Sequence, residues 1–235
     1  MYLVANGEIY NHNEVYDTAR KEGLQNDRIS GSDCEVIAHA YAKYGGPKTA
    51  AMLDGMFAFV VFEEDAVSGK VNAFAARDPV GIKPLYYGRT KCSNANSDDA
   101  AAYVFASELK ALVGHADPST VVAIPPGHHW TPEEGLVCYY NPEWLRDDDY
   151  APREDANHKM KDEEVQEAFS KAVQKRTMAD VDYGFFLSGG VDSCIVSHDL
   201  LPLWRQEQTK LGDDRPIQTF TVGMENSPDV MAERP

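Results

Sequence analysis

The chain is poor in the features that mark secreted, zinc-binding or membrane proteins. Only four cysteines occur in 235 residues, and none belongs to a CxxC pair: Cys34, Cys92, Cys138 and Cys194. A disulfide framework or a zinc site is therefore not expected, and free thiols in a reducing compartment are the better interpretation. No apolar run approaches the roughly 20 residues that span a bilayer, and residues 1–6 lack the basic region and apolar core of a signal peptide. We expect a soluble, cytosolic protein with no membrane partner.

Basic residues are also in deficit, since 22 lysines and arginines face 38 acidic residues and give a formal charge of −16. A field of that sign repels nucleic acid, so nucleic acid is not an expected partner. It still permits a nucleotide site, because a cluster of backbone N–H groups can hold phosphate inside an acidic protein. A hydrophobic content of 43% suits a chain that buries a core rather than a disordered one, and the length suits about one to two domains.

The hydrophobic pattern divides the chain near residue 141. Before that point it predicts helices at 14–21 and 33–44 and strands at 2–5, 56–62, 71–76, 85–87, 103–106, 121–124, 128–131 and 136–140. Residues 89–101 are small and polar and predict a loop or insertion of open function. Residues 142–157, with two prolines and an acidic run, are the expected linker. Beyond it, helix 162–178, strand 183–187, helix 193–203, a charged loop at 205–216 and strand 218–222 form a βαβ pattern that indicates a parallel sheet.

The most specific motif is Ser188-Gly189-Gly190-Val191-Asp192-Ser193, between a strand and a helix. Glycines let backbone approach a ligand closely, and a helix start offers N–H groups and the positive end of its dipole to a phosphate. The serines can donate hydroxyl hydrogen bonds, and Asp192 suits phosphate if Mg²⁺ lies between them. No lysine follows the glycines, so this is not a Walker A loop; an ordinary strand-to-helix turn is the alternative. Leu187 and Val222 lie at strand ends, where they can pack on an adenine or simply in a core.

Three features of the first half have both a chemical and a structural interpretation. In Asn6-Gly7 a side-chain amide and a backbone N–H can stabilise an oxyanion, but Asn-Gly alone favours a type I′ hairpin turn. Glu8 and Asp33 can bind an ammonium group, although Asp33 is also typical of a first-turn acid in a helix with Ser32 as its N-cap. In the segment 77–85 we expect a structural turn, fixed by its prolines and glycine, with a local pair between its first two residues, Arg77 and Asp78.

Several blocks follow one another in a fixed order: Asn6-Gly7-Glu8-Ile9-Tyr10-Asn11, Gly31-Ser32-Asp33-Cys34-Glu35, Leu53-Asp54-Gly55-Met56-Phe57-Ala58, Arg77-Asp78-Pro79-Val80-Gly81-Ile82-Lys83-Pro84-Leu85 and Ala106-Ser107-Glu108. In this order they resemble the N-terminal-nucleophile glutaminase domain of asparagine synthetases. The motif 188–193 resembles the pyrophosphate loop of ATP pyrophosphatases, and together with Phe220-Thr221-Val222-Gly223-Met224 it extends the resemblance over nearly the whole chain.

The resemblance implies an α+β glutaminase domain with layered αββα architecture and antiparallel sheets in residues 1–141, the linker 142–157, and in 158–235 the start of an α/β, parallel-sheet ATP-pyrophosphatase-like domain. It implies a ligase of asparagine biosynthesis, which activates aspartate with ATP and Mg²⁺ as an aspartyl-adenylate and amidates it with ammonia from glutamine. Asn6 and Gly7 match the oxyanion hole, and Glu8 and Asp33 match the residues that hold the glutamine α-amino group. The implied ATP-binding set is Leu187, Ser188, Gly189, Gly190, Asp192, Ser193, Val222 and Gly223, with Asp192 as a candidate Mg²⁺ ligand.

The chain departs from the family pattern at the nucleophile. The family uses a cysteine directly after the initiator Met, and the α-amino group of that cysteine is the base. In this chain the position holds Tyr2. Its phenol, with a pKa of ~10, is a poor substitute for a thiol. The carboxylate-binding arginine and the aspartate-binding residues also lie outside the chain. We therefore expect a chain shortened at both ends, as a fragment or a short paralogue, and without glutaminase activity or asparagine synthesis alone. Missing strands would expose apolar surface and favour pairing with another chain, such as a homodimer.

Two other functions fit part of the pattern. Another glutamine amidotransferase, such as one making a phosphoribosylamine, shares the first domain but needs a phosphoribosyl loop in place of Ser188–Ser193. A non-catalytic module that keeps only a nucleotide or glutamine pocket is favoured by the missing terminal cysteine.

Overall fold

The computed structural model describes residues 1–25, 27–64, 69, 71–90, 102–142, 161–179, 181–212 and 215–223. The chain forms two compact units, Met1–Tyr150 and Ala151–Pro235. Apart from residue 142, the expected linker 142–157 lies outside the described residues, and so does most of the expected insertion 89–101. The linker and domain boundaries therefore stay predictions.

Unit 1 contains two antiparallel sheets. The five-stranded sheet has the order β1-β2-β3-β7-β8, and the three-stranded sheet has the order β5-β4-β6. Their strands are β1 (Tyr2–Ile9), β2 (Gly55–Glu64), β3 (Val71–Arg77), β4 (Tyr86–Arg89), β5 (Tyr103–Ala106), β6 (Val122–Ala123), β7 (His128–Thr131) and β8 (Gly135–Cys138). Most of the expected strands are present to within two residues.

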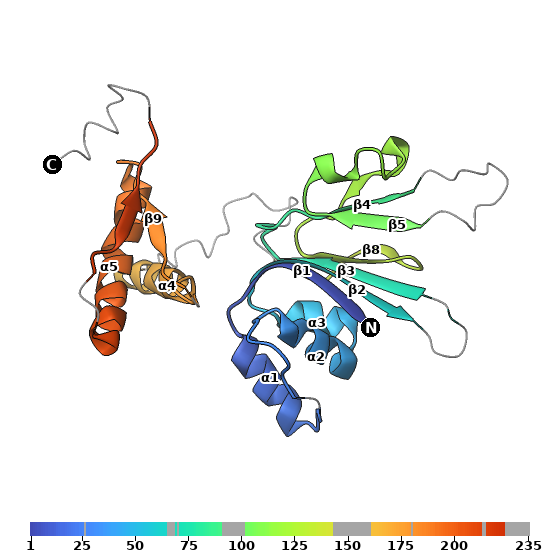
Figure 1. Ribbon diagram of the computed structural model, residues 1–235, viewed down its shortest axis with the longest axis horizontal. Coiled ribbons are helices and arrows are strands. Elements are labelled where there is room, and N and C mark those ends of the chain that lie inside the picture. The colour runs from blue at the N-terminus through green and yellow to red at the C-terminus, as the bar shows by residue number, and fades with distance from the viewer. Residues whose placement is uncertain are drawn as a thin grey trace, which may run out of the picture. The chain divides into compact units, whose positions relative to one another are not determined.

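The helices of unit 1 gather on one face of the five-stranded sheet, and β4 and β5 lie across its other face (Figure 1). These helices are α1 (His12–Lys21), α2 (Glu35–Tyr44) and α3 (Gly46–Met52). Two 3₁₀ turns, η2 (Leu109–Leu112) and η3 (Pro118–Thr120), follow β5. The α+β class with antiparallel sheets is confirmed, and the described residues show three of the four expected layers: helices, sheet, sheet.

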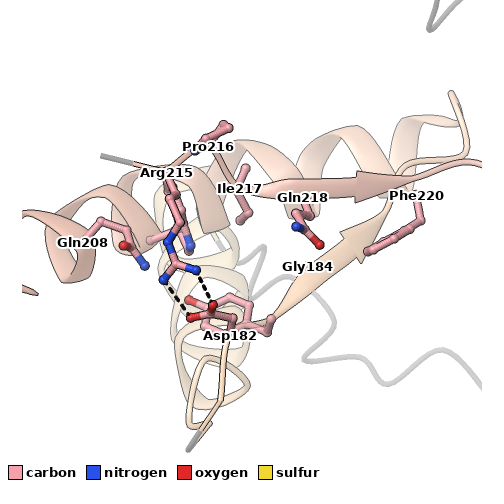
Figure 2. Close-up of a pocket in the computed structure, with 10 residues that line it drawn as sticks. Asp182, Gly184, Gln208, Arg215, Pro216, Ile217, Gln218 and Phe220 are labelled. Carbon is pink, nitrogen blue, oxygen red and sulfur yellow. Dashed lines mark hydrogen bonds and ion pairs between the residues drawn. The ribbon is translucent and has the colours of Figure 1, made fainter. Parts of the chain in front are cut away.

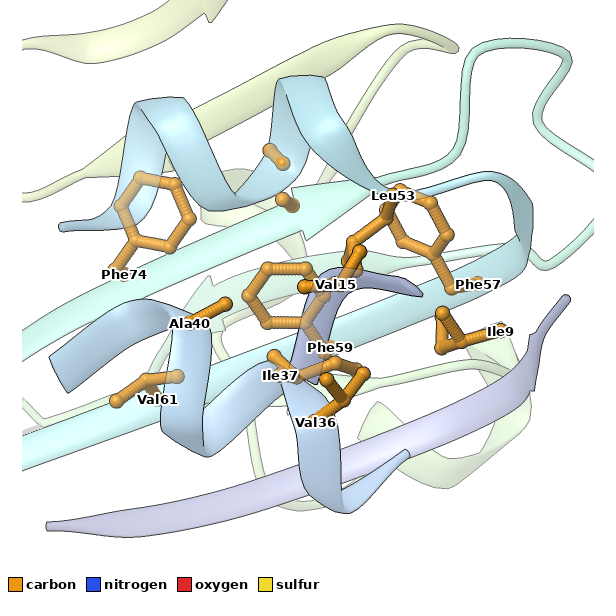
Figure 3. Packing of buried hydrophobic residues seen from close by; sticks show 12 residues of the cluster. Ile9, Val15, Val36, Ile37, Ala40, Leu53, Phe57, Phe59, Val61 and Phe74 are labelled. Carbon is orange, nitrogen blue, oxygen red and sulfur yellow. The ribbon is translucent and has the colours of Figure 1, made fainter. Parts of the chain in front are cut away.

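Strand β2 is buried on both faces because it runs through the centre of these layers. Its odd-numbered residues, Phe57, Phe59 and Val61, pack under the helices with Ile37 (Figure 3). Its even-numbered residues, including Val60, pack instead between the two sheets with Trp130, Leu85 and Ile124. This period-2 division is what a central strand between two apolar layers requires.

Strand β1 runs straight through Asn6-Gly7, so the expected hairpin turn there is wrong. Asn6 pairs with Ala58 and Gly7 with Phe57 in an antiparallel ladder. The glycine is needed for a close approach instead: at its φ of +153°, a Cβ atom would lie 2.1 Å from the carbonyl oxygen of Met56. Pairing with β2 overrides the local turn preference of the dipeptide.

Unit 2 has the expected βαβ arrangement. Helix α4 (Asp162–Lys175) precedes β9 (Gly184–Phe186), α5 (Val191–Leu211) and β10 (Gln218–Phe220), and β10 pairs with β9 in parallel. The expected charged loop at 205–216 is wrong over its first half, since α5 continues to Leu211 and passes through Pro202. In the described part of this unit only Val173, Ser197 and Leu200 are buried.

Two global expectations can be compared with the structure. None of the described helices has the length and apolar character to cross a membrane. The three described cysteines, Cys34, Cys138 and Cys194, are free thiols.

Candidate functional site

The first candidate site lies on the outer edge of β1. Phe57 directs both backbone groups toward β3, since its carbonyl accepts from Asp78 N at 2.8 Å and its N–H donates to the Asp78 carboxylate at 3.3 Å. The N–H and C=O of one residue point to the same side of an antiparallel strand. Gly7 and Phe57 are therefore a non-hydrogen-bonded pair, and the Gly7 N–H points away from β2. Among the described residues β1 is an edge strand, so this N–H is available to a ligand.

Other groups converge on the same edge. The Asp33 carboxylate accepts the N–H of Ile9, the next outward-pointing one along β1, at 2.5 Å. The Cys34 thiol donates to the Gly7 carbonyl at 3.5 Å, and Asn6 Nδ2 donates to Ser107 Oγ at 3.0 Å. The structure thus brings Asn6, Gly7 and Asp33 together.

Asp33 is not a first-turn acid of α2, because the helix begins two residues later at Glu35. Ser32 is not its N-cap either. That position is Cys34, and no side chain caps the helix. Because the Asp33 carboxylate bonds to β1 instead, it belongs to the edge of the sheet rather than to the helix.

Two carboxylates act on the Cys34 thiol at this edge. The pKa of the Cys34 thiol rises to about 12, first through burial and then through the charges of Asp33 and Glu8. The negative field of both carboxylates is thus felt beside Gly7, whose carbonyl accepts from this thiol. Such a field favours a bound ammonium group. It also keeps Cys34 protonated at neutral pH, so this cysteine cannot serve as the nucleophile.

Tyr2 does not occupy the place of a nucleophile. It pairs with Phe62 at the opposite end of β1 from Gly7, which puts it roughly 17 Å away at the rise of a β-strand. Tyr2 therefore shares only its residue number with the family cysteine, and it does not lie beside Gly7. A nucleophile for this oxyanion site has to come from a segment other than Tyr2.

The turn after β3 is structural, as expected, but the expected pair between Arg77 and Asp78 is wrong. The carboxylate of Asp78 is fully buried and accepts five backbone N–H groups, from Phe57, Val80, Gly81, Ile82 and Lys83. The guanidinium of Arg77 donates to three backbone carbonyls, those of Gly81, Lys83 and Ile124. The two charged side chains bond to backbone groups instead of to each other, because the turn offers each of them more hydrogen-bond partners than the other side chain can.

The second candidate site is the loop between β9 and α5. Gly189 has a φ of +74°, a conformation that favours glycine, and Gly190 is the N-cap of α5. The Ser193 hydroxyl closes the loop. It donates to the Gly190 carbonyl at 2.9 Å and accepts from the N–H and the hydroxyl of Ser188 at 3.2 and 3.1 Å. The two serines thus shape the loop from inside.

The loop leaves a run of backbone donors free. Among the described residues, no acceptor bonds the N–H groups of 189–193, and the first bonded one in the helix is Cys194, which donates to the Gly190 carbonyl at 3.1 Å. Successive free N–H groups at a helix start form an anion site. Asp192 is exposed in the first turn of α5, where one carboxylate can share a Mg²⁺ with phosphate oxygens.

Leu187 and Val222 lie at the same edge of the sheet. The Leu187 N–H donates to the Phe220 carbonyl at 3.0 Å, and the Thr221 hydroxyl donates to the Leu187 carbonyl at 2.7 Å. The carboxyl ends of both strands therefore meet beside the loop. Val222 is 89% exposed, so within the described residues it is a free apolar surface rather than a core residue.

A pocket in unit 2 lies at the other end of these strands (Figure 2). It is lined by Asp182 and Gly184 before and in β9, by the segment 215–218 and by α5, and an ion pair of 2.7 Å between Asp182 and Arg215 bounds it. Ligands of open α/β sheets bind beyond the carboxyl ends of the strands. This pocket is at the amino ends, so it is not the nucleotide site.

Comparison with known proteins shows the family of the chain. Residues 1–126, more than half of the chain, match the family profile of the glutamine amidotransferase domain. The chain belongs to the glutamine amidotransferase domain family. Residues 164–234 match the asparagine synthase profile, which contradicts the alternative with a phosphoribosyl loop in that segment.

Relatives of this amidotransferase-domain chain align with both of its parts. It is 35% identical to the probable asparagine synthetase (glutamine-hydrolyzing) of Schizosaccharomyces pombe, over 100% of the chain and 40% of that protein. It is 38% identical to asparagine synthetase (glutamine-hydrolyzing) 3 of Arabidopsis thaliana, over 99% of the chain and 36% of that protein. The chain thus spans about two fifths of the length of these relatives. A solved glutamine phosphoribosylpyrophosphate amidotransferase of Bacillus subtilis, complexed with ADP and GMP, aligns with 86% of the chain and 44% of its own at 17% identity and a TM-score of 0.42.

Two residues of the first candidate site were not predicted as site residues from the sequence. Ser107 contacts Asn6 across a separation of 101 residues, which no local pattern reveals. Cys34 lies beside Gly7, and only its place next to Asp33 in the sequence pointed to it.

Proposed function

We propose that this chain is part of a glutamine-hydrolysing asparagine synthetase, with a glutamine site at the edge of β1 and an ATP site at the start of α5. The observation that carries the proposal is the run of free backbone donors at 189–193, beside the carboxyl ends of two parallel strands. In a chain that also has an amidotransferase domain, and within the segment that matches asparagine synthase, such a loop suits a nucleotide-dependent amidation.

In the glutamine site, Gly7 N–H and Asn6 Nδ2 would donate to the carboxamide oxygen as it becomes an oxyanion. Asp33 and Glu8 would hold the α-amino group, because the negative charge of both acts on the Cys34 thiol beside Gly7. The ammonia released would amidate aspartate.

In the ATP site, the N–H groups of Gly189–Ser193 would hold the phosphates, with Ser188 and Ser193 shaping the loop. Leu187, Val222 and Gly223 would contact the nucleoside. Asp192 fits Mg²⁺, since this ion is usually bound by one or two carboxylates and phosphate oxygens. The ion would neutralise phosphate charge when the aspartate carboxylate is activated by ATP as an adenylate. The described residues contain no cluster of three or more candidate metal ligands, so Mg²⁺ would arrive with the nucleotide. A cytosolic location and a homodimer are part of the same proposal.

The test uses two glycines at opposite ends of α5. A Cβ at Gly190 would meet only Ser188 Oγ, at 3.5 Å, whereas Gly212 has a φ of +69° with open space around it. Gly190→Ala should therefore leave stability unchanged and weaken ATP–Mg²⁺ binding about tenfold or more, because its methyl crowds backbone that phosphate approaches. Gly212→Ala should lower the unfolding free energy by about 1 kcal/mol and leave binding unchanged.

Calorimetric titration of the purified 235-residue chain with ATP–Mg²⁺ measures the binding, and thermal unfolding measures the stability. Equal ATP affinity in the wild type and Gly190→Ala, or no binding to either, would refute the nucleotide site. Assays for AMP and asparagine, with aspartate and ammonium supplied, distinguish a catalytic chain from a module that only binds.

A further inference from the structure

Asn6 is the only polar side chain that the five-stranded sheet contributes to a groove between the two sheets of unit 1. The groove is otherwise lined by apolar residues and by one other polar residue, Ser107: its lining is Val4, Ala5, Asn6, Ala58, Phe59, Val60, Leu85, Phe105, Ala106 and Ser107. Asn6 is exposed, so burial does not fix the direction of its amide, and a hydrogen bond to a protein group is needed to define that direction. Within the described residues, the Ser107 hydroxyl is the only group that hydrogen-bonds the Asn6 side chain.

We propose that Ser107 is a positioning residue that sets the amide plane of Asn6, so that Asn6 Nδ2 and Gly7 N–H act on the same ligand oxygen. This inference rests on the proposed glutamine site and deepens it. Ser107 Oγ accepts one hydrogen of Asn6 Nδ2 at 3.0 Å. The amide nitrogen is planar, so fixing the direction of one N–H also fixes that of the other, which stays available.

The geometry explains why this bond is needed. The final torsion of an asparagine side chain is broad and nearly unrestrained, whereas Gly7 N–H is fixed by the register of β1 with β2. A two-donor oxyanion hole needs both donors held before the reaction. Ser107 supplies the restraint for the donor that the backbone does not fix.

Ser107 is itself held by the second sheet. It follows β5 directly, and the preceding residue, Ala106, pairs with Tyr86 of β4. The orientation of Asn6 therefore depends on the packing of the three-stranded sheet against the five-stranded one. The contact between residues 6 and 107 ties the candidate site to both sheets.

The experiment compares Ser107→Ala and Ser107→Thr in the 235-residue chain by NMR. The first measurement needs no ligand: the order of the Asn6 side-chain amide should be high in the wild type and Ser107→Thr, and low in Ser107→Ala. Ser119→Ala is the matched control, since it also removes a hydroxyl that bonds a side chain, Asp117, in the same unit. A disordered Asn6 amide in the wild type, or an equally ordered one in Ser107→Ala, overturns the proposal.

The second measurement separates the positioning role from the glutamine site. L-glutamine and L-norvaline share the α-amino acid group, but only glutamine has the carboxamide. Ser107→Ala should weaken glutamine binding three- to tenfold, the worth of about one hydrogen bond, and leave norvaline binding unchanged, with recovery in Ser107→Thr. If the wild type binds glutamine no better than norvaline, the oxyanion donors of the proposed function fail. If it does discriminate and Ser107→Ala discriminates equally well, only the positioning role fails.

Discussion

Asp78→Asn tests the buried turn that supports the candidate glutamine site. The wild-type carboxylate accepts three N–H groups on Oδ1 and two on Oδ2. In the amide one oxygen becomes an NH₂ group, so at least two buried N–H donors lose their acceptor and face another donor. Each such donor costs about 1–3 kcal/mol, and breaking a buried charge network costs about 3–5 kcal/mol. We expect a loss of about 3–5 kcal/mol, a large part of the ~5–15 kcal/mol by which domains are stable.

Urea denaturation measures this loss if the signal comes from unit 1 alone. Trp130 is 2% exposed in that unit, so its fluorescence reports unfolding once Trp144 and Trp204 are replaced by Phe. Asp27→Asn is the control, because the side chain of Asp27 is 85% exposed and, in the part of the chain that the structure describes, pairs only with Arg20. Such a surface pair contributes at most ~1 kcal/mol. A loss below about 1 kcal/mol in Asp78→Asn would show that the five bonds do not hold the turn.

Gly7→Ala should lower the unfolding free energy by about 2–3 kcal/mol in the same urea assay and abolish glutamine binding, since its Cβ would lie 2.1 Å from the Met56 carbonyl oxygen. Gly31→Ala is the control and should be neutral, because a Cβ at that position meets no atom within 4 Å. Glu35→Gln should destabilise the chain most above pH 4.5, because the Ser30 hydroxyl and the Ile29 N–H lower the pKa of Glu35 from 4.5 to about 2. The difference in unfolding free energy between wild type and variant should shrink as the pH falls toward 2. A difference that does not change with pH contradicts this prediction. Tyr2→Cys, even with Met1 removed, should release no glutamate from glutamine, because position 2 lies at the far end of β1 from Gly7; measurable turnover would show that the strand end reaches the site.

Much of the fold could be predicted, because its strands have a clear hydrophobic periodicity and many of its helices and strands end at residues that favour turns. Strand β7 begins and ends where expected, and β2 is a long apolar run that is buried on both faces. The extent of α5 was missed because its last turns are charged. Leu200, Trp204 and Gln208 recur every four residues on one face, and Gly212 in the left-handed region ends the helix.

The candidate sites could be predicted only in part, because their geometry depends on distant pairings. The motif 188–193 is local, so its strand, loop and helix were readable from the sequence. The role of Asn6-Gly7 depends on which neighbour Phe57 bonds, and that is set by β3 and Asp78. The short spacing of Arg77 and Asp78 suggested an ion pair, but it could not show that peptide groups from Phe57 and Ile124 surround them.

Both candidate sites rely on backbone donors that the fold leaves without an acceptor, for two different reasons. Within the described residues, Gly7 N–H is free because it lies on an edge strand in a non-hydrogen-bonded pair. The N–H groups of 189–193 are free there because the start of a helix has no acceptor for them. No side-chain truncation removes a peptide N–H. An alanine scan of the polar residues would therefore report side chains that bind or orient, such as Asn6 and Ser193, but not these backbone donors. Substitutions of Gly7 and Gly190 test the donors, since a Cβ at Gly7 would clash with β2 and displace the strand that carries the N–H, and a Cβ at Gly190 would crowd the backbone at the start of α5.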